Sequence, residues 1–455
     1  MYNIAVILAG GLGTRLFPLS RTNYPKQFLR IFNGKSLLQL TYERISGLNL
    51  FNQIWICTNR RYTYLVKRDI ESINDRLILE EKSKNTAYAI LYSCFKVLSQ
   101  LKAENCNFIF FPSDHFVFNQ EEFDNSVRKL LFFLNKYDKT FIVGIKPTFP
   151  STEYGYVRKN QIIEDNLFTV ARFVEKPSRN RAKYYLRKGN YLWNSGIYAF
   201  KFRSFINDFY QHNKDLIVFD SLDSLIKNID LFPNISIDYL YSQKTKNLAI
   251  LESYFEWSDL GSFEEIVKIS NYFSDRIMQI DSNVNIIFDE SEGLSNKRYC
   301  FIDVKDLIVV DTADFQLISK KGKTKKISKV LTDIPQEQKD YCSFDFRPWG
   351  YYREIEKTEG KYRIKNIVIY PYQELSLQYH NHRDEYWIIL SGFGKLIIDN
   401  TSIDIYPKGF FHIPKGKVHK VINLSPDNME IIEVQVGEIL SENDIVRLKD
   451  RYERI

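Results

Sequence analysis

Short apolar segments alternate with longer polar stretches of helical period over roughly the first 265 residues. Four of the apolar segments have the length and composition of buried strands: Ile4–Leu8, Ile54–Thr58, Phe108–Phe111 and Phe141–Val143. The stretches between them, such as Thr86–Leu101 and Glu121–Asn135, are spaced like helices. Short strands separated by helices predict an α/β fold with a mostly parallel, doubly wound (Rossmann-like) sheet.

The pattern changes twice further along the chain. From about Asp281 to Val330 it consists of short β segments with turns, which predict a few coils of a β-solenoid or a small sheet between domains. From about Phe344 almost every segment reads as a strand, with Gly and Pro between strands, which predicts an all-β jelly-roll barrel. A chain of 455 residues is too long for one core. We therefore expect three domains, at residues 1–270, 271–340 and 341–455.

A glycine-rich loop follows the first predicted strand. Gly10, Gly11 and Gly13 let the backbone approach a polyphosphate and turn its N–H groups toward it. Arg15 and Lys26 supply charge that would neutralise a triphosphate. In doubly wound sheets, ligands bind beyond the carboxyl ends of the strands, which is where this loop lies. The loop therefore indicates a nucleoside triphosphate site.

Two better-known phosphate loops do not match. A Walker A loop would close with Gly-Lys-Ser/Thr, which is absent here. A dinucleotide fingerprint would have a third glycine where Leu16 stands. The loop instead continues through Pro18 to Tyr24-Pro25-Lys26-Gln27, and Pro112-Ser113-Asp114-His115 follows another strand at the same predicted edge.

With these motifs the chain resembles the sugar-nucleotide pyrophosphorylases, and more closely the bifunctional bacterial mannose-1-phosphate guanylyltransferase/mannose-6-phosphate isomerase family. Further motifs occur in the family's order: Lys84-Asn85-Thr86-Ala87, Thr152-Glu153-Tyr154-Gly155-Tyr156, Phe173-Val174-Glu175-Lys176-Pro177, Trp193-Asn194-Ser195-Gly196, Ser236-Ile237-Asp238-Tyr239 and Trp257-Ser258-Asp259-Leu260-Gly261-Ser262-Phe263. Two positions depart from the family pattern, Leu12 in place of Ser and Lys84 in place of Arg. The resemblance covers nearly the whole chain.

The resemblance implies a nucleotidyltransferase that makes GDP-mannose from mannose 1-phosphate and GTP. An oxygen of the sugar phosphate attacks the α-phosphorus and pyrophosphate leaves, so positioning and charge neutralisation carry the rate. The implied catalytic residues are Arg15, Lys26, Asp114 and Asp259, the last two as Mg²⁺ ligands. The implied nucleotide-binding residues are Gly10, Gly11, Gly13, Thr14, Arg15, Lys26 and Asn85. Lys176 would meet the sugar phosphate, and the sugar pocket would be lined by Gly155, Glu175 and Asn194.

A second site is predicted in the barrel. Gln378, His380 and His382 alternate along one strand and share one face. Cupin barrels place two ligands one residue apart and then a Glu five residues later, a register that Gln378, His380 and Glu385 match and that a His380/His382 pair does not. His419 follows at the expected spacing in the second strand pair. The ligand set Gln378, His380, Glu385 and His419 is compatible with Zn²⁺, Mn²⁺ or Co²⁺.

The barrel resembles the isomerase half of the same family, from Arg347-Pro348-Trp349-Gly350 to Asp444-Ile445-Val446-Arg447. This implies interconversion of fructose 6-phosphate and mannose 6-phosphate, in which a metal polarises the carbonyl and a base carries a proton between two carbons. The sequence does not identify that base. Candidates for holding the sugar phosphate are Arg383, Arg447 and Arg454, of which we also place Arg447 among the catalytic residues. The departures here are Tyr386 in place of His and Tyr372 in place of Gly.

The amino-acid composition restricts the classes of molecule that we expect the protein to bind. Lys and Arg number 63 and Asp and Glu 56, a net charge of +7 spread along the chain, which suits phosphorylated small molecules better than nucleic acid. Five cysteines without a CxxC pair, no signal peptide and no apolar stretch of membrane-spanning length predict a cytoplasmic protein with no membrane partner. The oligomeric state stays open, and a homo-oligomer is possible.

Two other functions compete with the bifunctional enzyme. In the first, the chain is a nucleotidyltransferase whose barrel is a sugar-sensing or assembly module. In the second, it is a non-enzymatic regulator with a transferase-like domain. Such a regulator would be expected to lose the charged residues of the glycine loop, and Arg15 and Lys26 are present.

Overall fold

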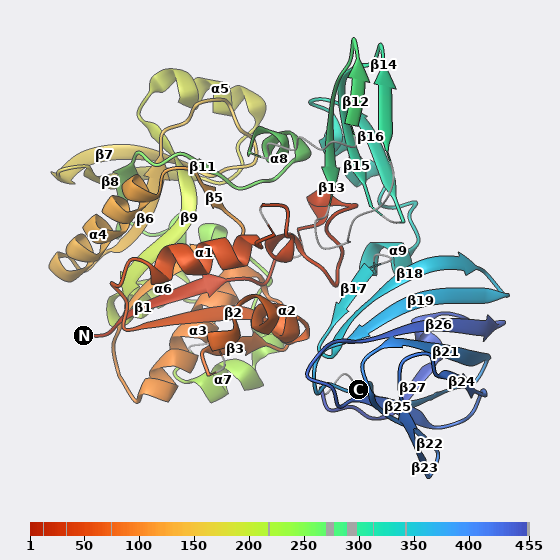
Figure 1. Ribbon diagram of the computed structural model, residues 1–455. Helices are drawn as coiled ribbons and strands as arrows, with labels where there is room; N and C mark the ends of the chain where they lie inside the picture. The colour runs from red at the N-terminus through yellow and green to blue at the C-terminus, as the bar shows by residue number, and fades with distance from the viewer. Residues whose placement is uncertain are drawn as a thin grey trace. The chain divides into compact units, whose positions relative to one another are not determined.

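The computed structural model describes residues 1–11, 13–32, 34–73, 75–216, 219–269, 277–288, 298–312, 314–341 and 344–452. The contacts of the chain divide it into two compact units (Figure 1). The first unit comprises Met1–Gly13 and Lys26–Ser270, and the second comprises Thr14–Pro25 and Asn271–Ile455. The division into three domains stays a prediction.

The first unit is built on a nine-stranded sheet with the strand order β3-β2-β1-β4-β9-β6-β10-β8-β7. Its strands are β1 (Asn3–Leu8), β2 (Gln53–Asn59), β3 (Leu77–Glu80), β4 (Asn107–Pro112), β6 (Thr140–Ile145), β7 (Tyr156–Glu164), β8 (Leu167–Val174), β9 (Tyr191–Lys201) and β10 (Leu248–Ser253). A separate ribbon pairs β5 (Phe116–Val117) with β11 (Trp257–Ser258). The four strands predicted from their apolar composition are confirmed as β1, β2, β4 and β6.

The prediction of a mostly parallel sheet is wrong for one half of it. Strands β3, β2, β1 and β4 are parallel, and so are β6 and β10. Strand β9 runs antiparallel to both β4 and β6, and β7 and β8 form an antiparallel pair. An apolar segment shows that a strand is buried but carries no information about its direction, so the sequence pattern could not distinguish the two halves.

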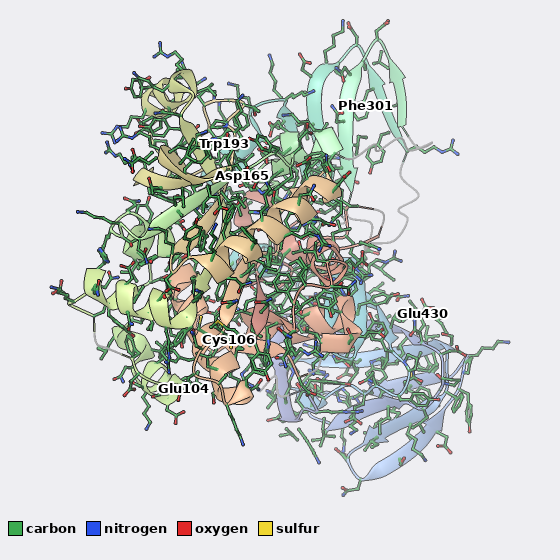
Figure 2. The ribbon with its side chains drawn as sticks, turned by 90° about the vertical axis from the view of Figure 1, so that its left-hand side faces the viewer. Glu104, Cys106, Asp165, Trp193, Phe301 and Glu430 are labelled. Carbon is green, nitrogen blue, oxygen red and sulfur yellow. The ribbon has the colours of Figure 1, made fainter. Side chains whose placement is uncertain are left out.

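Helices cover the sheet of the first unit. They are α1 (Leu37–Ser46), α2 (Thr63–Asp69), α3 (Asn85–Leu101), α4 (Gln120–Lys136), α5 (Arg179–Lys188), α6 (Phe202–His212), α7 (Leu222–Lys227) and α8 (Phe263–Ile269). One large core joins α3 and α6 to alternate residues of two strands, such as Val6 and Phe110, because side chains alternate along a strand. A smaller aromatic cluster contains Trp193, which Figure 2 labels, with Tyr154 and Tyr156. The predicted helices at Thr86–Leu101 and Glu121–Asn135 are confirmed as α3 and α4.

The larger segment of the second unit, Asn271–Ile455, has short strands in two small sheets near its start. In one, β12 (Ile277–Ile280) lies parallel to β14 (Tyr299–Ile302), and Figure 1 shows the two side by side. In the other, β13 (Asn283–Phe288) pairs in parallel with β15 (Lys305–Asp311), which pairs antiparallel with β16 (Gln316–Lys320). These strands confirm the β-rich segment predicted between about Asp281 and Val330, and the helix α9 (Gln336–Asp340) follows it.

The segment Thr14–Pro25 groups with the second unit although it directly follows the glycine loop in the chain. Arg21, whose side chain is fully buried, donates a hydrogen bond to the Asp314 carboxylate at 2.8 Å. The ring of Phe17 packs edge-on against Phe315, with 4.9 Å between the ring centroids. A buried charge pair and an apolar contact therefore anchor the segment that connects Gly13 to Lys26.

Two antiparallel sheets form the barrel. One has the strand order β17-β18-β19-β26-β21-β24 and the other β23-β22-β25-β20-β27. Their bounds are β17 (Phe344–Arg347), β18 (Gly350–Thr358), β19 (Tyr362–Ile369), β20 (Leu377–His380), β21 (Arg383–Ser391), β22 (Gly394–Ile398), β23 (Thr401–Ile405), β24 (Phe410–Ile413), β25 (His419–Asn423), β26 (Met429–Gly437) and β27 (Ile445–Lys449). Apolar residues such as Trp387, Leu396 and Ile431 form the core between the sheets. The predicted all-β barrel is confirmed.

None of the described helices is long and apolar enough to cross a membrane.

Cys57, Cys94, Cys106 and Cys300 are free thiols, and Cys342 lies outside the described residues. Figure 2 labels Cys106, which is fully buried just before β4.

We expect two leucines of the barrel to differ in how much they contribute to its stability. Leu396 is fully buried, whereas the side chain of Leu390 is 46% exposed. Leu396→Ala leaves a cavity among closely packed neighbours, so we expect it to lower the free energy of unfolding by about 2–5 kcal/mol. Leu390→Ala is the matched control and is expected to cost less than about 1 kcal/mol. Thermal unfolding of the full chain measures both, and equal losses would contradict this description of the core.

Candidate functional sites

The amino group of Lys26 joins two acidic positions in the first unit. Its Nζ lies 2.8 Å from a carboxylate oxygen of Asp114 and also donates a hydrogen bond to the backbone carbonyl of Asp259. Lys26 is only 6% exposed, so this cation is held away from bulk water. The Asp259 carboxylate accepts a hydrogen bond from the Tyr154 hydroxyl at 2.8 Å. Three residues predicted to be catalytic, from three separate segments, thus lie together.

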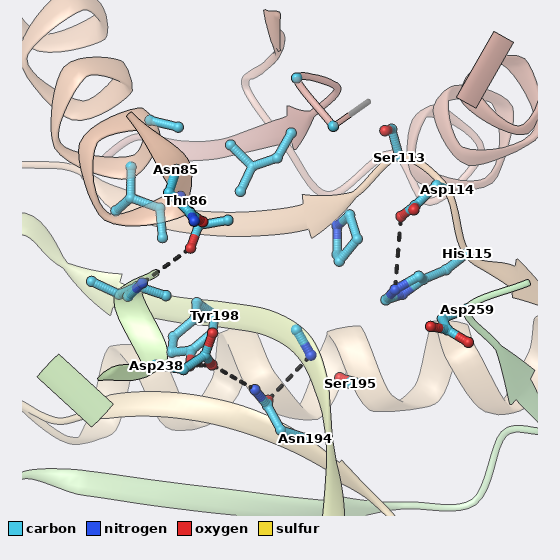
Figure 3. A pocket seen from close by; sticks show the side chains of 18 of the residues that line it. Asn85, Thr86, Ser113, Asp114, His115, Asn194, Ser195, Tyr198, Asp238 and Asp259 are labelled. Carbon is cyan, nitrogen blue, oxygen red and sulfur yellow. Dashed lines mark hydrogen bonds and ion pairs between the residues drawn. The ribbon is translucent and has the colours of Figure 1, made fainter. Parts of the chain in front are cut away.

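Electrostatics keep Asp114 ionised. Burial alone would raise the pKa of its carboxyl, but the charge and the hydrogen bond of Lys26 outweigh that effect and help to hold the pKa below its usual value. His115 lies beside it (Figure 3), and 3.9 Å separates its Nε2 from a carboxylate oxygen of Asp114. Burial lowers the pKa of His115 to about 4, so its imidazole is neutral at pH 7. An ionised carboxylate at this point suits a hard divalent cation.

These groups lie at one end of a cavity of about 670 Å³ that is contained in the first unit. Its lining includes the predicted residues Gly10, Gly11, Asn85, Asp114, Gly155, Glu175, Asn194 and Asp259. A volume of this size is typical of small-molecule sites. The structure thus gathers most of the predicted transferase residues around one space.

Asn194, one of the residues predicted to line the sugar pocket, belongs to a hydrogen-bonded group. Asn194 donates to a carboxylate oxygen of Asp238 at 3.0 Å and accepts from the Gly196 amide at 3.1 Å (Figure 3). The same oxygen of Asp238 accepts from the Tyr198 hydroxyl at 2.7 Å. Asp238 belongs to one of the sequence motifs, but the motif alone indicated no role for it. The group offers fixed donors and acceptors of the kind that hold sugar hydroxyls.

Glu175 lies in the same part of the cavity. A Cβ added at Gly155 would come within 2.6 Å of a Glu175 carboxylate oxygen, so the Gly155 backbone lies close to this carboxylate. Burial and the neighbouring Asp238 raise the pKa of Glu175. Lys176 forms an ion pair with it at 2.9 Å, and its own side chain is 48% exposed.

Not every predicted residue of the glycine loop is placed. Gly13 contacts Lys26, since an added Cβ would lie 2.4 Å from the Lys26 Cβ. Arg15 is exposed and belongs to Thr14–Pro25, the segment that groups with the second unit, so its contact with a triphosphate stays a prediction. The side chain of Thr14 and the departure at Leu12 lie outside the described part of the structure.

Sequence reasoning missed a buried acid in this cavity. Glu80 is the last residue of β3, is 4% exposed and is among the residues that line the cavity. Its Oε1 atom has no hydrogen-bond partner among the described residues. Burial raises the pKa of its carboxyl to about 7. A single acidic residue at a strand end carries no motif, and only the three-dimensional position distinguishes it.

Three of the four predicted metal ligands meet in the barrel. His380, Glu385 and His419 offer ligand atoms that all lie within 4.8 Å of one another. His380 Nε2 lies 2.9 Å from one carboxylate oxygen of Glu385, and His419 Nε2 lies 3.5 Å from the other. Each of the three side chains is 1–2% exposed.

The donor atoms of this cluster fit a divalent transition metal. Glu385 Oε2 and His419 Nε2 are buried and have no hydrogen-bond partner among the described residues. The other ring nitrogen of His419 lies 3.0 Å from the Lys417 carbonyl, an arrangement that leaves the Nε2 lone pair for a metal. Burial would raise the pKa of Glu385, but the two imidazoles outweigh it and hold the pKa well below its usual range. Two imidazoles and a carboxylate match the ligands of Zn²⁺ and similar ions.

Gln378, the fourth predicted ligand, pairs directly with His419 across β20 and β25. Its side-chain oxygen accepts a hydrogen bond from the Ser376 hydroxyl at 2.7 Å. His382 is separate from the cluster, because its Nδ1 lies 2.7 Å from the Asp444 carboxylate and its side chain is 48% exposed.

The predicted phosphate-binding arginines have different surroundings. Arg383 is 2% exposed, and its guanidinium donates to Glu385 at 3.2 Å and to the Ser441 carbonyl at 3.1 Å. Arg447 pairs with Gln378 between β20 and β27 and lines a small cavity beside the cluster. Arg454 lies outside the described residues. The roles of all three stay predictions.

The two residues of the barrel that depart from the family pattern are not among the predicted metal ligands. Tyr386 alternates with Glu385 and stacks on His412, with 4.6 Å between the rings. Tyr372 has a φ of 59° and is 60% exposed. A glycine adopts that backbone conformation more easily, which accounts for the usual Gly there.

Both halves of the chain are similar to known proteins. Residues 4–276 match a family model described as nucleotidyl transferase, and residues 335–450 match one described as mannose-6-phosphate isomerase C-terminal. The chain is 32% identical over 480 residues to "Mannose-1-phosphate guanylyltransferase 2" of Escherichia coli O157:H7, covering 99% of this chain and 98% of that protein. It is 33% identical over 487 residues to the mannose-1-phosphate guanylyltransferase of Salmonella montevideo, covering 99% of both.

The chain belongs to the mannose-1-phosphate guanylyltransferase family. The alginate biosynthesis protein AlgA of Pseudomonas aeruginosa is 30% identical over 479 residues, 99% of this chain and 97% of that protein. A crystal structure from Thermus thermophilus, described as a mannose-1-phosphate geranyltransferase, has a TM-score of 0.61 and 26% identity, covering 73% of this chain and 99% of that one. The resemblance inferred from the motifs is confirmed, and so is the fold class of an α/β transferase domain followed by a cupin barrel.

The metal cluster makes a direct prediction. His380→Ala removes one of three converging ligands, so purified protein dialysed against Zn²⁺ is expected to retain at least about tenfold less metal than wild type. His412→Ala is the matched control, because His412 is 43% exposed and pairs with Asp384 instead. Metal analysis measures both variants, and equal metal content in wild type and His380→Ala would contradict the ligand assignment.

The buried Glu80 predicts a pH-dependent change in stability. Its folded pKa of about 7 lies above the ordinary 4.5, so folding favours the neutral acid, and ionisation destabilises the protein as pH rises from about 4.5 to 7. Glu80→Gln removes this cost, which is at most about 3 kcal/mol. We expect the variant to raise the melting temperature more at pH 8 than at pH 5. Exposed Glu81→Gln is the control, and a gain that is the same at both pH values would contradict the assignment.

Proposed function

We infer that the chain transfers a guanylyl group from GTP to mannose 1-phosphate in the first unit, and interconverts fructose 6-phosphate and mannose 6-phosphate in the barrel. The observation that carries the first activity is the contact of Lys26 with Asp114 and Asp259, two residues that line a cavity of about 670 Å³. The names of the relatives support the guanylyl donor and the mannose acceptor.

The residues of the first unit fit the needs of this reaction. Asp114 and Asp259 would hold Mg²⁺, which when bound neutralises charge on the phosphates. Lys26 places a second positive charge beside them, where charge develops as pyrophosphate leaves. Asn194 and Glu175 orient the sugar, so that its phosphate oxygen faces the α-phosphorus. No residue of the protein needs to act as a nucleophile.

The barrel fits an aldose–ketose isomerase. His380, Glu385 and His419, with Gln378 beside them, would hold a divalent metal, which when bound polarises the sugar carbonyl. The cavity beside this cluster has a volume of about 50 Å³ in this structure and is lined by Arg383, Lys365 and Glu433 among others. It is too small for a hexose phosphate, so its side chains must move apart when the substrate enters.

One alternative is that the barrel only senses sugar and has no isomerase activity. The two departures from the family pattern in the barrel, Tyr386 and Tyr372, do not support it. Tyr386 lies on the face opposite Glu385 and stacks on His412, so it leaves the ligand atoms unchanged. The isomerase model matches residues 335–450, which is nearly the whole barrel.

One experiment with two assays tests both activities. Lys26→Ala removes a charge that stabilises the transition state, so kcat for GDP-mannose formation is expected to fall by about 10²–10³. His380→Ala is expected to abolish the isomerase, and each variant is expected to keep the other activity above half of the wild-type value. Lys35→Ala, in which an exposed lysine paired with Glu43 is removed, is the control.

Three results would contradict the proposal. Wild type could fail to make GDP-mannose, it could fail to interconvert the two hexose phosphates when supplied with Zn²⁺, Mn²⁺ or Co²⁺, or Lys26→Ala could keep normal turnover. A strong preference for dTTP or CTP as the donor would move the protein to a neighbouring pyrophosphorylase.

A further inference from the structure

The segment Thr14–Pro25 lies between two residues of the first unit that touch each other. Gly13 and Lys26 belong to the first unit, and a Cβ added at Gly13 would lie 2.9 Å from the Lys26 backbone nitrogen. The segment between them groups with the second unit. It carries Arg15, and its last residue is joined directly to Lys26. A change in how the segment is held therefore reaches Lys26 through the chain itself.

Arg21 anchors this segment in the second unit. Its side chain is fully buried, and it donates a hydrogen bond to a carboxylate oxygen of Asp314 at 2.8 Å. Its guanidinium carbon lies 4.4 Å from the centre of the Phe17 ring. Two of its nitrogens, Nε and Nη1, have no hydrogen-bond partner among the described residues. A buried charge without a counter-ion is costly, so the position of Arg21 depends on Asp314.

The carboxylate of Asp314 is itself held by the turn between β15 and β16. The Thr312 hydroxyl donates a hydrogen bond at 3.0 Å to the same carboxylate oxygen that pairs with Arg21. That hydroxyl also accepts a hydrogen bond from the Phe315 amide at 3.1 Å, and Thr312 is 3% exposed. The turn thus presents the carboxylate to Arg21 in a fixed position.

Apolar and backbone contacts hold other parts of the segment. Phe17 packs in an apolar cluster with Ile327 and Ile334. Further along, the backbone amide of Thr22 donates a hydrogen bond to the carbonyl of Lys339 at 3.0 Å. All of these partners belong to the second unit. The second unit, and not the glycine loop, therefore determines the conformation of the segment.

We propose that Asp314 is a positioning residue for the transferase, because by holding Arg21 it fixes the segment that carries Arg15 and leads into Lys26. Guanylyl transfer then depends on a carboxylate of the second unit that takes no part in the chemistry. The inference rests on the proposed guanylyl transfer and adds a residue on which its geometry depends. Small displacements of the groups that position a substrate lower the rate by up to about 10²-fold.

Kinetics of the full chain with GTP and mannose 1-phosphate, well below the melting temperature, test the proposal. Asp314→Leu leaves Arg21 buried without its carboxylate, so kcat for GDP-mannose formation is expected to fall by about 10- to 100-fold. The KM for mannose 1-phosphate is expected to stay within about twofold, because the predicted sugar residues lie outside the segment. The isomerase activity of the same preparation is expected to stay above about half of the wild-type value.

A double variant provides the rescue. Arg21→Met with Asp314→Leu replaces the buried pair by apolar side chains of similar size, which restores packing without leaving a charge behind. We expect it to recover at least about a third of the wild-type kcat. Asp333→Leu is the matched control, because Asp333 is exposed and belongs to the same unit, and it is expected to leave kcat unchanged. Asp314→Asn keeps the size of the side chain and removes its charge, so it replaces Asp314→Leu if that variant does not fold.

Hydrogen exchange of the amides in Thr14–Pro25 gives a readout that does not depend on activity. Exchange is expected to be at least about tenfold faster in Asp314→Leu than in wild type, and to return toward the wild-type rate in the double variant. The proposal is overturned if the segment exchanges at the wild-type rate in Asp314→Leu, if it exchanges faster while kcat is unchanged, or if both activities are lost together. A wild type that makes no GDP-mannose would refute the proposed function, and the exchange rates would still decide whether Asp314 holds the segment.

Discussion

The cost of burying charged groups without full pairing constrains both sites of this protein. Lys26 is nearly inaccessible to water and is stable there because Asp114 and the carbonyl of Asp259 surround its amino group. Glu80 and Glu385 are as deeply buried, yet each has a carboxylate oxygen that accepts no hydrogen bond from any described residue. Such atoms destabilise a protein unless a ligand completes their coordination. The complete pairs therefore hold each site in place, and the incomplete ones at the two sites leave atoms that a ligand could pair with.

Much of the fold could be predicted because burial leaves a clear pattern in sequence. The apolar segment at β1 and the helical spacing of α3 both reflect contact with a core, and both were predicted to within a few residues. Strand direction leaves no such trace, so the antiparallel course of β9 appeared only in the structure. The same limitation applies to Thr14–Pro25. Its grouping with the second unit depends on Arg21 meeting Asp314, nearly 300 residues further along the chain.

The functional sites likewise contain residues that could be predicted from the sequence and residues that could not. The convergence of His380, Glu385 and His419 in the barrel could be predicted because alternation along a strand fixes which side chains share a face. Asp114 and Asp259 could be predicted because they belong to motifs of a known family. Glu80 and Asp238 could not be assigned roles from residue type alone, since isolated acids are usually solvated. They become candidates only through their burial and the groups around them, which the folded chain brings together.

In the proposed function, two active sites share a chain but not a metal. The most direct test removes the transition metal from wild-type protein with a chelator and then supplies Mg²⁺ alone. We predict that the interconversion of fructose 6-phosphate and mannose 6-phosphate disappears and returns when Zn²⁺, Mn²⁺ or Co²⁺ is added, while the synthesis of GDP-mannose stays within about twofold of the untreated enzyme throughout. Loss of both activities together, or an isomerase that survives removal of the metal, would contradict the separation of the two sites.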